Sequence, residues 1–361
     1  MKTLVSLLLF SLLLISQWGM ARSNESVKSP QWLDAKSFGL EIQDFMNAQQ
    51  EGYMLSKMTF EKYLKVLPNF PKAFQASGGS LDNLLKTLAD KLSVYSEWKF
   101  LDITKYQDNY HLLFRVVSIE QRFDYMIIEV GAYDNELLVQ DWYFYTTELW
   151  ATEAFERAQA LWSEYVPESQ QQRRLVTQFF NLNGASGIEI FQKLDEELQA
   201  MPIMQSRLYL SLTDDNLIEG IKVLLDVAPK DRFTFSRMDY YYAVEDYASS
   251  LKALNQMLDE VSYDPQLQVL KSEMLFYLGK EKEALAVISD MIRRRPNDDE
   301  VYYFAFSMLA FYENYDQAIL ALKVLEQDYG YEFSNEDLLN SEDLAGIVTS
   351  SAYKQYRQSG G

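Results

Sequence analysis

His111 is the only histidine of the chain and the side chain best suited to acid–base chemistry. An imidazole beside a carboxylate can accept and donate a proton near neutral pH. The run around it alternates as a β-strand does, so His111 and Arg115 share one face. Asp102 and Asp124, in the runs before and after, are the candidate acidic neighbours. These four residues could line a ligand pocket. The alternative, which is more common for a lone histidine, is that His111 is an ordinary sheet residue with no catalytic role.

Other chemistries find little support in the residue types. The chain has no cysteine and one histidine, which excludes a cysteine nucleophile and a typical zinc site. The glycine patterns that bind nucleotide phosphates or present a catalytic serine are missing from the sequence. We therefore expect no metal, no cofactor and no enzymatic activity.

The elements that would position His111 form an α+β module from Pro30 to about Thr147. Apolar spacing predicts a helix over 38–55 and shorter helices over 60–67 and 81–92. The spacing then changes to alternation in four runs rich in aromatic and β-branched residues: 95–106, 110–118, 122–130 and 136–146. Short connections between these runs predict antiparallel hairpins in a four-stranded sheet.

Helices followed by an antiparallel meander resemble the layout of the NTF2-like and cystatin-like group over residues 38–146. The resemblance implies a curved, cone-shaped sheet. The inner face of such a cone could enclose a small ligand, and the candidate pocket around His111 would lie there.

From Glu148 onward the pattern predicts helices almost without interruption, the first over 148–165 and five in the last third over 247–261, 265–278, 281–294, 298–312 and 315–328. Asp264 followed by Pro265 is a typical helix start, because aspartate accepts a hydrogen bond from the first turn and proline has no amide to leave unpaired. Gly279 suits the left-handed residue that ends a helix. The sequence predicts an all-α region over 148–361, closed by polar capping helices.

A period of 34 residues runs through the last third of the chain. Small residues recur at this spacing, each followed four places later by an aliphatic one: Ser250 and Leu254, Ala284 and Ile288, Ala318 and Leu322. The period resembles the tetratricopeptide (TPR) repeat, in which two helices cross closely at the small residue. The resemblance is best from Asp231 to Glu332. It departs from the family at Met238 and Phe306, whose bulk implies wider helix spacing or a local rotation.

The TPR resemblance implies a solenoid whose concave wall holds a partner. The first helix of each hairpin would place seven residues on that wall: Phe235, Asp239, Tyr242, Val269, Glu273, Phe276 and Tyr303. This strip is aromatic and acidic with few cations, so the expected partner is a protein or peptide with an apolar or basic segment. The alternative is that these residues only pack or face water.

The N-terminus predicts export. Lys2 precedes an apolar run from Leu4 to Ile15, and the small residues Gly19 and Ala21 follow. The run is shorter than the about 20 residues that span a membrane. A signal peptide over 1–21, cleaved after Ala21, is therefore favoured over the alternative of an uncleaved anchor. We expect a bacterial protein that is periplasmic or secreted, with no membrane span in the mature chain.

The formal net charge of −20 argues against nucleic acid and anionic membranes as partners, because phosphate binding needs clustered Lys and Arg. The sequence thus predicts an exported, non-enzymatic scaffold: an α+β module over 22–147 and a TPR-like α-solenoid over 148–361 that binds a polypeptide in its groove. The alternative function is a small-ligand-binding or weakly enzymatic NTF2-like module that the repeats dock.

Overall fold

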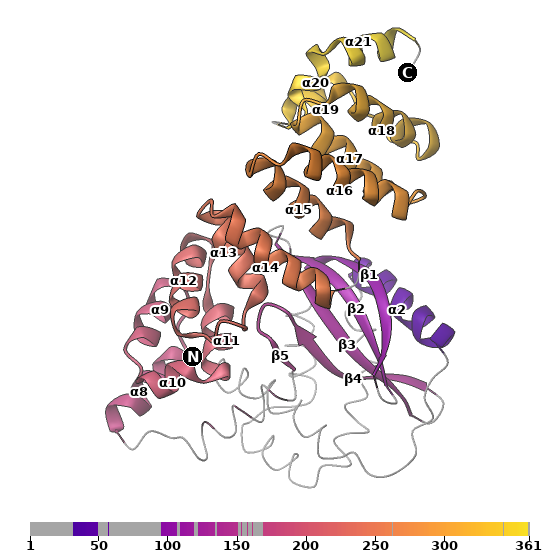
Figure 1. Cartoon of the computed structure of the whole chain (residues 1–361). Coiled ribbons are helices and arrows are strands. Elements are labelled where there is room, and N and C mark those ends of the chain that lie inside the picture. The colour runs from indigo at the N-terminus through magenta and orange to yellow at the C-terminus, as the bar shows by residue number, and fades with distance from the viewer. Residues whose placement is uncertain are drawn as a thin grey trace. The chain divides into compact units, whose positions relative to one another are not determined.

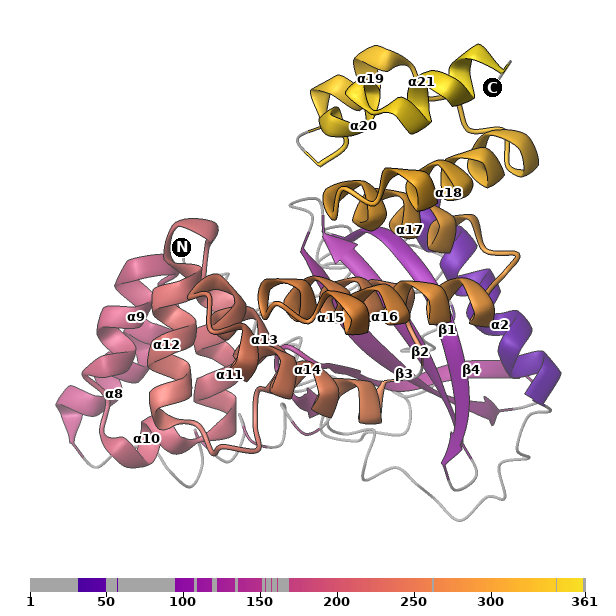
Figure 2. The same ribbon diagram turned by 45° about the horizontal axis from the view of Figure 1, so that its top comes forward.

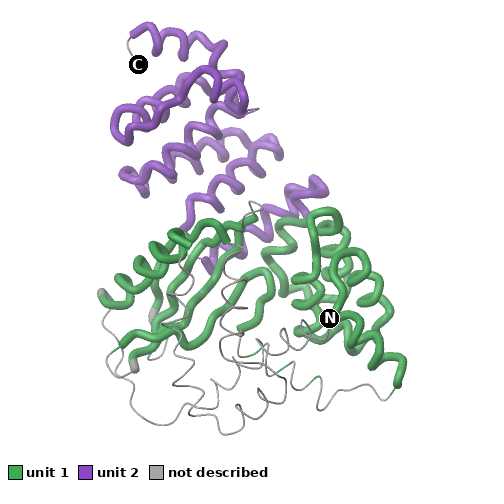
Figure 3. Tube along the Cα trace, turned by 180° about the vertical axis from the view of Figure 1, so that it is seen from behind, with its two compact units in different colours: residues 1–240 green, residues 241–361 purple. Residues whose placement is uncertain are grey.

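The computed structural model describes most of the chain from Trp32 onward. The described residues are 32–49, 95–106, 109–118, 122–133, 136–150, 169–261, 263–341 and 343–359, with residues 57, 153, 157 and 161 described singly. The predicted signal peptide and the predicted helices 60–67 and 81–92 lie outside them. The chain divides into unit 1, up to Tyr240, and unit 2, from Tyr241 (Figure 3). The boundary predicted at residues 147 and 148 falls inside unit 1.

Unit 1 contains an antiparallel sheet whose strands are paired in chain order (Figure 1). The strands are β1 (Tyr95–Tyr106), β2 (Asn109–Ser118), β3 (Phe123–Tyr133), β4 (Glu136–Phe144) and β5 (Leu149–Trp150). The four predicted runs are confirmed, with ends that differ by no more than three residues.

The short strand β5 occupies the start of the region predicted to be the helix 148–165. Glu148 has a positive φ of 50°, which turns the chain back on itself. Leu149 and Trp150 then pair with Phe144 and Tyr143 of β4. The predicted helix start was wrong because a tight turn, which left no strong sequence signal, adds a fifth strand to the sheet.

Helix α2 (Trp32–Asn47) packs along β1, the outermost strand of the described sheet (Figures 1 and 2). The Trp98 amide donates to Asn47 Oδ1 at 2.7 Å, and Asn47 Nδ2 donates to the Trp98 carbonyl at 2.9 Å. The Phe100 amide donates to Gln43 Oε1 at 2.7 Å. Side-chain amides of α2 thus satisfy backbone groups that an outer strand leaves unpaired.

The remaining described elements of unit 1 are helical. Its elements are α8 (Gln170–Phe179), α9 (Gly184–Gln192), α10 (Glu196–Ala200), α11 (Pro202–Ser211), the 3₁₀ turn η1 (Asp214–Asn216), α12 (Leu217–Val227) and α13 (Thr234–Ala243), whose last residues belong to unit 2. Phe179, Phe191 and Phe233 are fully buried in the core of these helices. Apolar burial of this kind is the main stabilising contribution to the bundle.

Hydrogen bonds and an ion pair join these helices to the end of the sheet. The buried Ser206 hydroxyl donates to the Thr147 carbonyl at 2.8 Å. The Thr234 amide donates to Glu148 Oε1 at 2.9 Å, and Arg232 lies 3.5 Å from the same carboxylate. The positive φ of Glu148 therefore both turns the chain and aims its carboxylate at the start of α13.

Unit 2 is a succession of helix hairpins (Figure 2). Its helices are α14 (Tyr247–Glu260), α15 (Pro265–Tyr277), α16 (Glu281–Arg294), α17 (Asp299–Phe311), α18 (Tyr315–Asp328), α19 (Asn335–Asn340), α20 (Ala345–Thr349) and α21 (Ser351–Gln358). The predicted bounds of α14 to α18 are confirmed to within one residue. Asp264 caps α15 as predicted, accepting from the Gln266 amide at 3.2 Å.

The turns of unit 2 repeat in backbone conformation as well as in sequence spacing. Glu245, Gly279 and Glu313, at intervals of 34 residues, have positive φ values of 62°, 72° and 57°. The next amide after each turn residue donates to a carbonyl five residues earlier, at 2.8 to 2.9 Å. This is the hydrogen bond of a Schellman turn, which ends a helix through one left-handed residue.

The small residues of the 34-residue period are buried, and two of them lie in packed helix pairs: Ala284 in α15–α16 and Ala318 in α17–α18. Ser250, Ala284 and Ala318 are 0% exposed. Ser272 Oγ of α15 donates to the Ala284 carbonyl of α16 at 3.0 Å, so the two backbones approach closely at this point.

In the part of the chain that the structure describes, no helix combines the length and apolar character needed to cross a bilayer.

Candidate functional site

A row of aromatic rings follows the turn edge of the unit 2 hairpins. We call this row the aromatic ladder; it consists of Tyr242, Tyr247, Phe276, Tyr277, Phe311 and Tyr312. The rings contact one another in sequence across three repeats. The centroid distances are 5.7 Å for Tyr242–Tyr247, 4.5 Å for Tyr247–Tyr277, 6.2 Å for Tyr277–Phe311, 5.7 Å for Phe276–Phe311 and 4.2 Å for Phe276–Tyr312. Such pairs stabilise beyond their buried area by about 0.5–1.5 kcal/mol each.

Glu273 is the acidic residue of this ladder. The Tyr242 hydroxyl donates to Glu273 Oε1 at 2.5 Å. Burial, followed by this hydrogen bond and by the carboxylate charge, raises the pKa of Tyr242. Burial and then the Glu273 charge also raise the pKa of Tyr277. Both hydroxyls therefore stay protonated near neutral pH and can donate to the carboxylate.

The counter-charge of Glu273 differs from that of the half-buried Glu326 and Asp298 and resembles that of the half-buried Asp299, whose carboxylate accepts from the Tyr331 hydroxyl at 2.9 Å. Glu326 lies 2.7 Å from Arg357, and Asp298 lies 3.3 Å from Arg295. Over the described part of unit 2, Glu273 forms no ion pair with a basic side chain. Its partners among the described residues are the hydroxyls of Tyr242 and Tyr277, which leaves a net negative site among aromatic rings.

Part of this surface is open to solvent. Tyr277 is 42% exposed, which is high for an aromatic side chain in the middle of a helical array. Glu273, Tyr242 and Phe276 are half-buried. The site can therefore be reached from outside without unfolding.

The structure brings together three of the seven residues predicted for the groove. Tyr242, Glu273 and Phe276 meet at the aromatic ladder. Val269 is half-buried and packs against the unit 2 core, while Tyr303 is exposed and lies 6.5 Å from the Tyr331 ring.

Phe235 and Asp239 belong to unit 1, whereas the aromatic ladder belongs to unit 2. Phe235 is 2% exposed, and its ring lies 5.4 Å from Phe123 and 6.4 Å from Tyr125 of β3. The groove assignment of Phe235 is corrected: its face of α13 packs on the sheet. Asp239 is half-buried, within electrostatic range of Asp124.

The residues predicted to surround His111 lie on both faces of the sheet. His111 is opposite Glu129 of β3, and its ring is 5.4 Å from Trp150. Burial lowers the pKa of His111, and the Glu129 charge opposes this effect. Arg115 shares the face of His111 and is buried, 3.8 Å from Glu97.

The strand register decides which acidic candidates can reach His111. Asp102 pairs with Leu113, on the face of His111, because a bulge after Phe100 shifts the alternation. Asp124 pairs with Val116, on the opposite face. The prediction of Asp124 as a neighbour of His111 is therefore corrected: the carboxylate across from His111 on β3 is Glu129.

Asp124 is instead buried in unit 1, within electrostatic range of the half-buried Asp239. Thr146 Oγ1 donates to Asp124 Oδ2 at 2.5 Å, and the Thr146 and Tyr125 amides donate to Oδ1. Burial nevertheless raises the pKa of Asp124 to about 7. Burial and then the Asp124 charge raise the pKa of Asp239 to about 7, against the opposing charge of Arg122.

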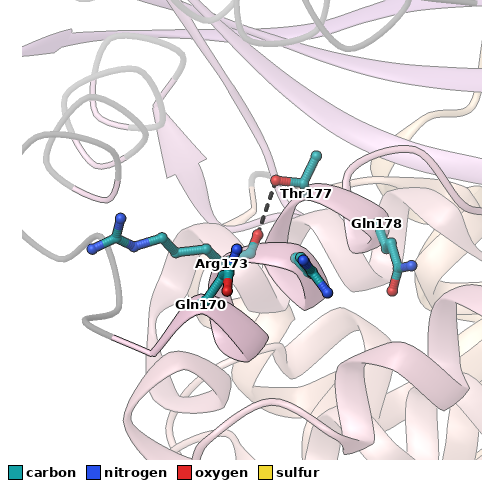
Figure 4. Close-up of a pocket in the computed structure, with 5 residues that line it drawn as sticks. Gln170, Arg173, Thr177 and Gln178 are labelled. Carbon is teal, nitrogen blue, oxygen red and sulfur yellow. Dashed lines mark hydrogen bonds between the residues drawn. The ribbon is translucent and has the colours of Figure 1, made fainter.

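A surface hollow in unit 1 lies along α8, with Gln170, Arg173, Arg174, Thr177 and Gln178 as its lining residues (Figure 4). Thr177 Oγ1 donates to the Arg173 carbonyl at 2.9 Å, which is a local helix contact. These side chains come from one exposed helix face. The hollow therefore offers no converging groups from a second element.

Sequence reasoning missed most of the ladder because its rings lie beside the predicted wall positions. Tyr277 and Phe311 are one period apart, and Tyr247 follows the left-handed turn, so the 34-residue spacing was the available signal.

No group of residues that could hold a metal ion occurs in the described part of the chain. No family model, curated protein or solved structure matches this chain.

Proposed function

We propose that unit 2 is a TPR-like array that binds a segment of a partner polypeptide, and that the protein acts as an exported scaffold. The observation that carries the proposal is the aromatic ladder, which spans three repeats and keeps Tyr277 partly exposed. Rigid aromatic side chains bury much area at little entropic cost, which is why they dominate protein interfaces.

The repeat geometry supports the TPR-like interpretation. Glu245, Gly279 and Glu313 share one turn conformation at the TPR period, and buried small residues occupy the crossings. Stacked hairpins of this kind present an extended surface rather than a closed pocket. An elongated peptide is the ligand that such a surface fits.

A peptide display experiment tests the binding function. The whole chain is immobilised, and a random peptide library is selected on it. Affinities of enriched peptides are then measured for wild type and for the double variant Tyr277→Ala/Tyr303→Ala. We expect the double variant to bind at least about 10-fold more weakly, because each truncation removes an exposed ring worth about 1 kcal/mol or more.

Leu320→Ala provides the matched control. Leu320 is an exposed apolar residue of α18, the second helix of its hairpin, and is 53% exposed. Its removal should leave affinity unchanged. A library that yields no specific peptide, or peptides that bind the double variant as well as wild type, would reject the proposed function.

Export is the second part of the proposal, and the first 21 residues support it through their charge and apolar run. A bacterial fusion of these residues to alkaline phosphatase, which is active only after export, tests it directly. Deleting Leu4–Ile15 should abolish the phosphatase activity. Activity that persists after this deletion would contradict the assignment.

A further inference from the structure

We propose that Glu273 and the surrounding tyrosines hold a basic side chain of the partner polypeptide, with arginine preferred over lysine. This inference rests on the proposed function, since it names the chemistry of the segment bound there. The occupant is a planar organic cation carried on a flexible aliphatic stem.

The first step of the argument is the unmatched charge. Elsewhere in unit 2 the half-buried Glu326 and Asp298 have arginine partners supplied by the chain itself. Among the described residues, Glu273 has tyrosine hydroxyls in place of a cation. A half-buried carboxylate gains most from a cation that arrives with part of its water already removed.

The second step is the aromatic surround. Tyr247 and Tyr277 are stacked at 4.5 Å with an interplanar angle of 20°, and Tyr242 meets Tyr247 edge to face. Ring faces attract cations, by about 0.5 kcal/mol at exposed sites and about 2 kcal/mol where water is removed. Tyr277 is exposed enough to offer a ring surface to a visiting group.

The third step is the choice of arginine. A guanidinium stacks flat on an aromatic ring and donates several hydrogen bonds in one plane, whereas an ammonium is a strongly hydrated point charge. At this site one edge of the guanidinium would face Glu273 and one face would lie on a tyrosine. The planar cation satisfies both features at once.

The fourth step is the long-range field. Residues 241–361 carry 21 acidic and 10 basic side chains. A net negative unit attracts a basic segment before contact and accelerates its association at low ionic strength. An acidic segment would be repelled by the same field.

Synthetic peptides test the proposal. A selected peptide that contains arginine is compared with versions in which that arginine is replaced by lysine or by neutral citrulline. Binding to the whole chain is measured by isothermal titration calorimetry. We expect citrulline to weaken binding by about 10-fold or more and lysine to weaken it less, as expected for loss of one charged contact.

Protein variants complete the test. Glu273→Gln should weaken the arginine peptide about 10-fold and abolish its advantage over the citrulline peptide. Glu281→Gln makes the same charge change at an exposed position of α16 and should keep that advantage. The citrulline comparison uses wild-type protein, so it holds even where Glu273→Gln fails to fold.

The possible outcomes distinguish failure of the cation site from failure of the proposed peptide-binding function. Selected peptides that lack basic residues, or arginine and citrulline peptides of equal affinity, would overturn the cation site while leaving peptide binding intact. A Glu273→Gln protein that prefers the arginine peptide to the citrulline peptide as strongly as wild type does would also overturn the cation site. A chain that binds no peptide of any charge would remove the proposed function, and the inference with it.

Discussion

Glu313 has the same left-handed backbone conformation as Glu245, two repeat periods earlier, with φ values of 57° and 62°. Gly279 lies midway between them in the chain and has a φ of 72°. A residue with a Cβ atom is strained in this region, whereas glycine adopts it freely. Two of three equivalent turns are therefore closed by an unfavourable residue, and the repeat geometry imposes the conformation on them.

Glu313→Gly should raise the free energy of unfolding by about 0.5–1 kcal/mol. Relief of left-handed strain, about 1–2 kcal/mol, exceeds the extra unfolded-state entropy of glycine, about 0.4–1 kcal/mol. The converse change, Gly279→Ala, should destabilise unit 2. Urea denaturation followed by circular dichroism measures both. A destabilised Glu313→Gly protein would show that the glutamate side chain outweighs its backbone strain.

Ala284→Leu should destabilise unit 2 by about 1–3 kcal/mol, because a larger side chain cannot be accommodated in a close-packed crossing without moving a helix. Ala284 is 0% exposed, and Ser272 bridges to its carbonyl across the crossing. Thermal melting monitored by circular dichroism would report the change. Leu320→Ala, at an exposed site, should stay within about 0.5 kcal/mol of wild type.

The helices of unit 2 could be predicted closely because several independent signals coincide there. Spacing, caps and breakers repeat every 34 residues, so an error at one boundary is corrected by its equivalents. The cap at Asp264 and the left-handed turn at Gly279 are both found where the sequence placed them. Local interactions specify these elements, and local interactions are what a sequence displays.

The candidate sites were less predictable because they depend on register and on distant contacts. Asp124 and His111 are 13 residues apart on neighbouring strands, yet the pairing of Val116 with Asp124 puts them on opposite faces. A shift of one residue in that hairpin would have reversed the result. Asp239 reaches the vicinity of Asp124 only through the packing of α13 on the sheet, which no local pattern reveals.

Asp124→Asn should flatten the dependence of unit 1 stability on pH. Burial raises the pKa of Asp124 to about 7 in the folded protein, above the ordinary value of 3.8. The folded state then binds more protons than the unfolded state between about pH 4 and pH 7, so stability falls as pH rises through this window. Asparagine cannot ionise and removes this contribution. Melting temperatures at pH 5 and pH 8 measure the slope.

Two comparisons control the Asp124 experiment. Asp226→Asn alters an exposed carboxylate that pairs with Lys222, and it should leave the slope between pH 5 and pH 8 unchanged. Asp239→Asn should flatten the slope as Asp124→Asn does, because burial also raises the pKa of Asp239 to about 7. A wild-type protein that is more stable at pH 8 than at pH 5, with an unchanged slope in Asp124→Asn, would contradict the raised pKa of Asp124.

His111 offers a direct titration, because the only histidine of the chain gives a single imidazole Cε1–H signal in a ¹H–¹³C NMR spectrum. Burial should hold its pKa below 6.5, with the Glu129 charge limiting the fall. Glu129→Gln should therefore lower the pKa of His111 further. Trp150→Ala, which removes the ring 5.4 Å away and admits water, should raise it toward 6.5. Since the unfolded chain protonates first as pH falls, His111 should also weaken the folded state below about pH 6.5. A pKa of His111 above 6.5 in wild type, or a rise of this pKa in Glu129→Gln, would show that the imidazole is not half-buried beside the Glu129 carboxylate.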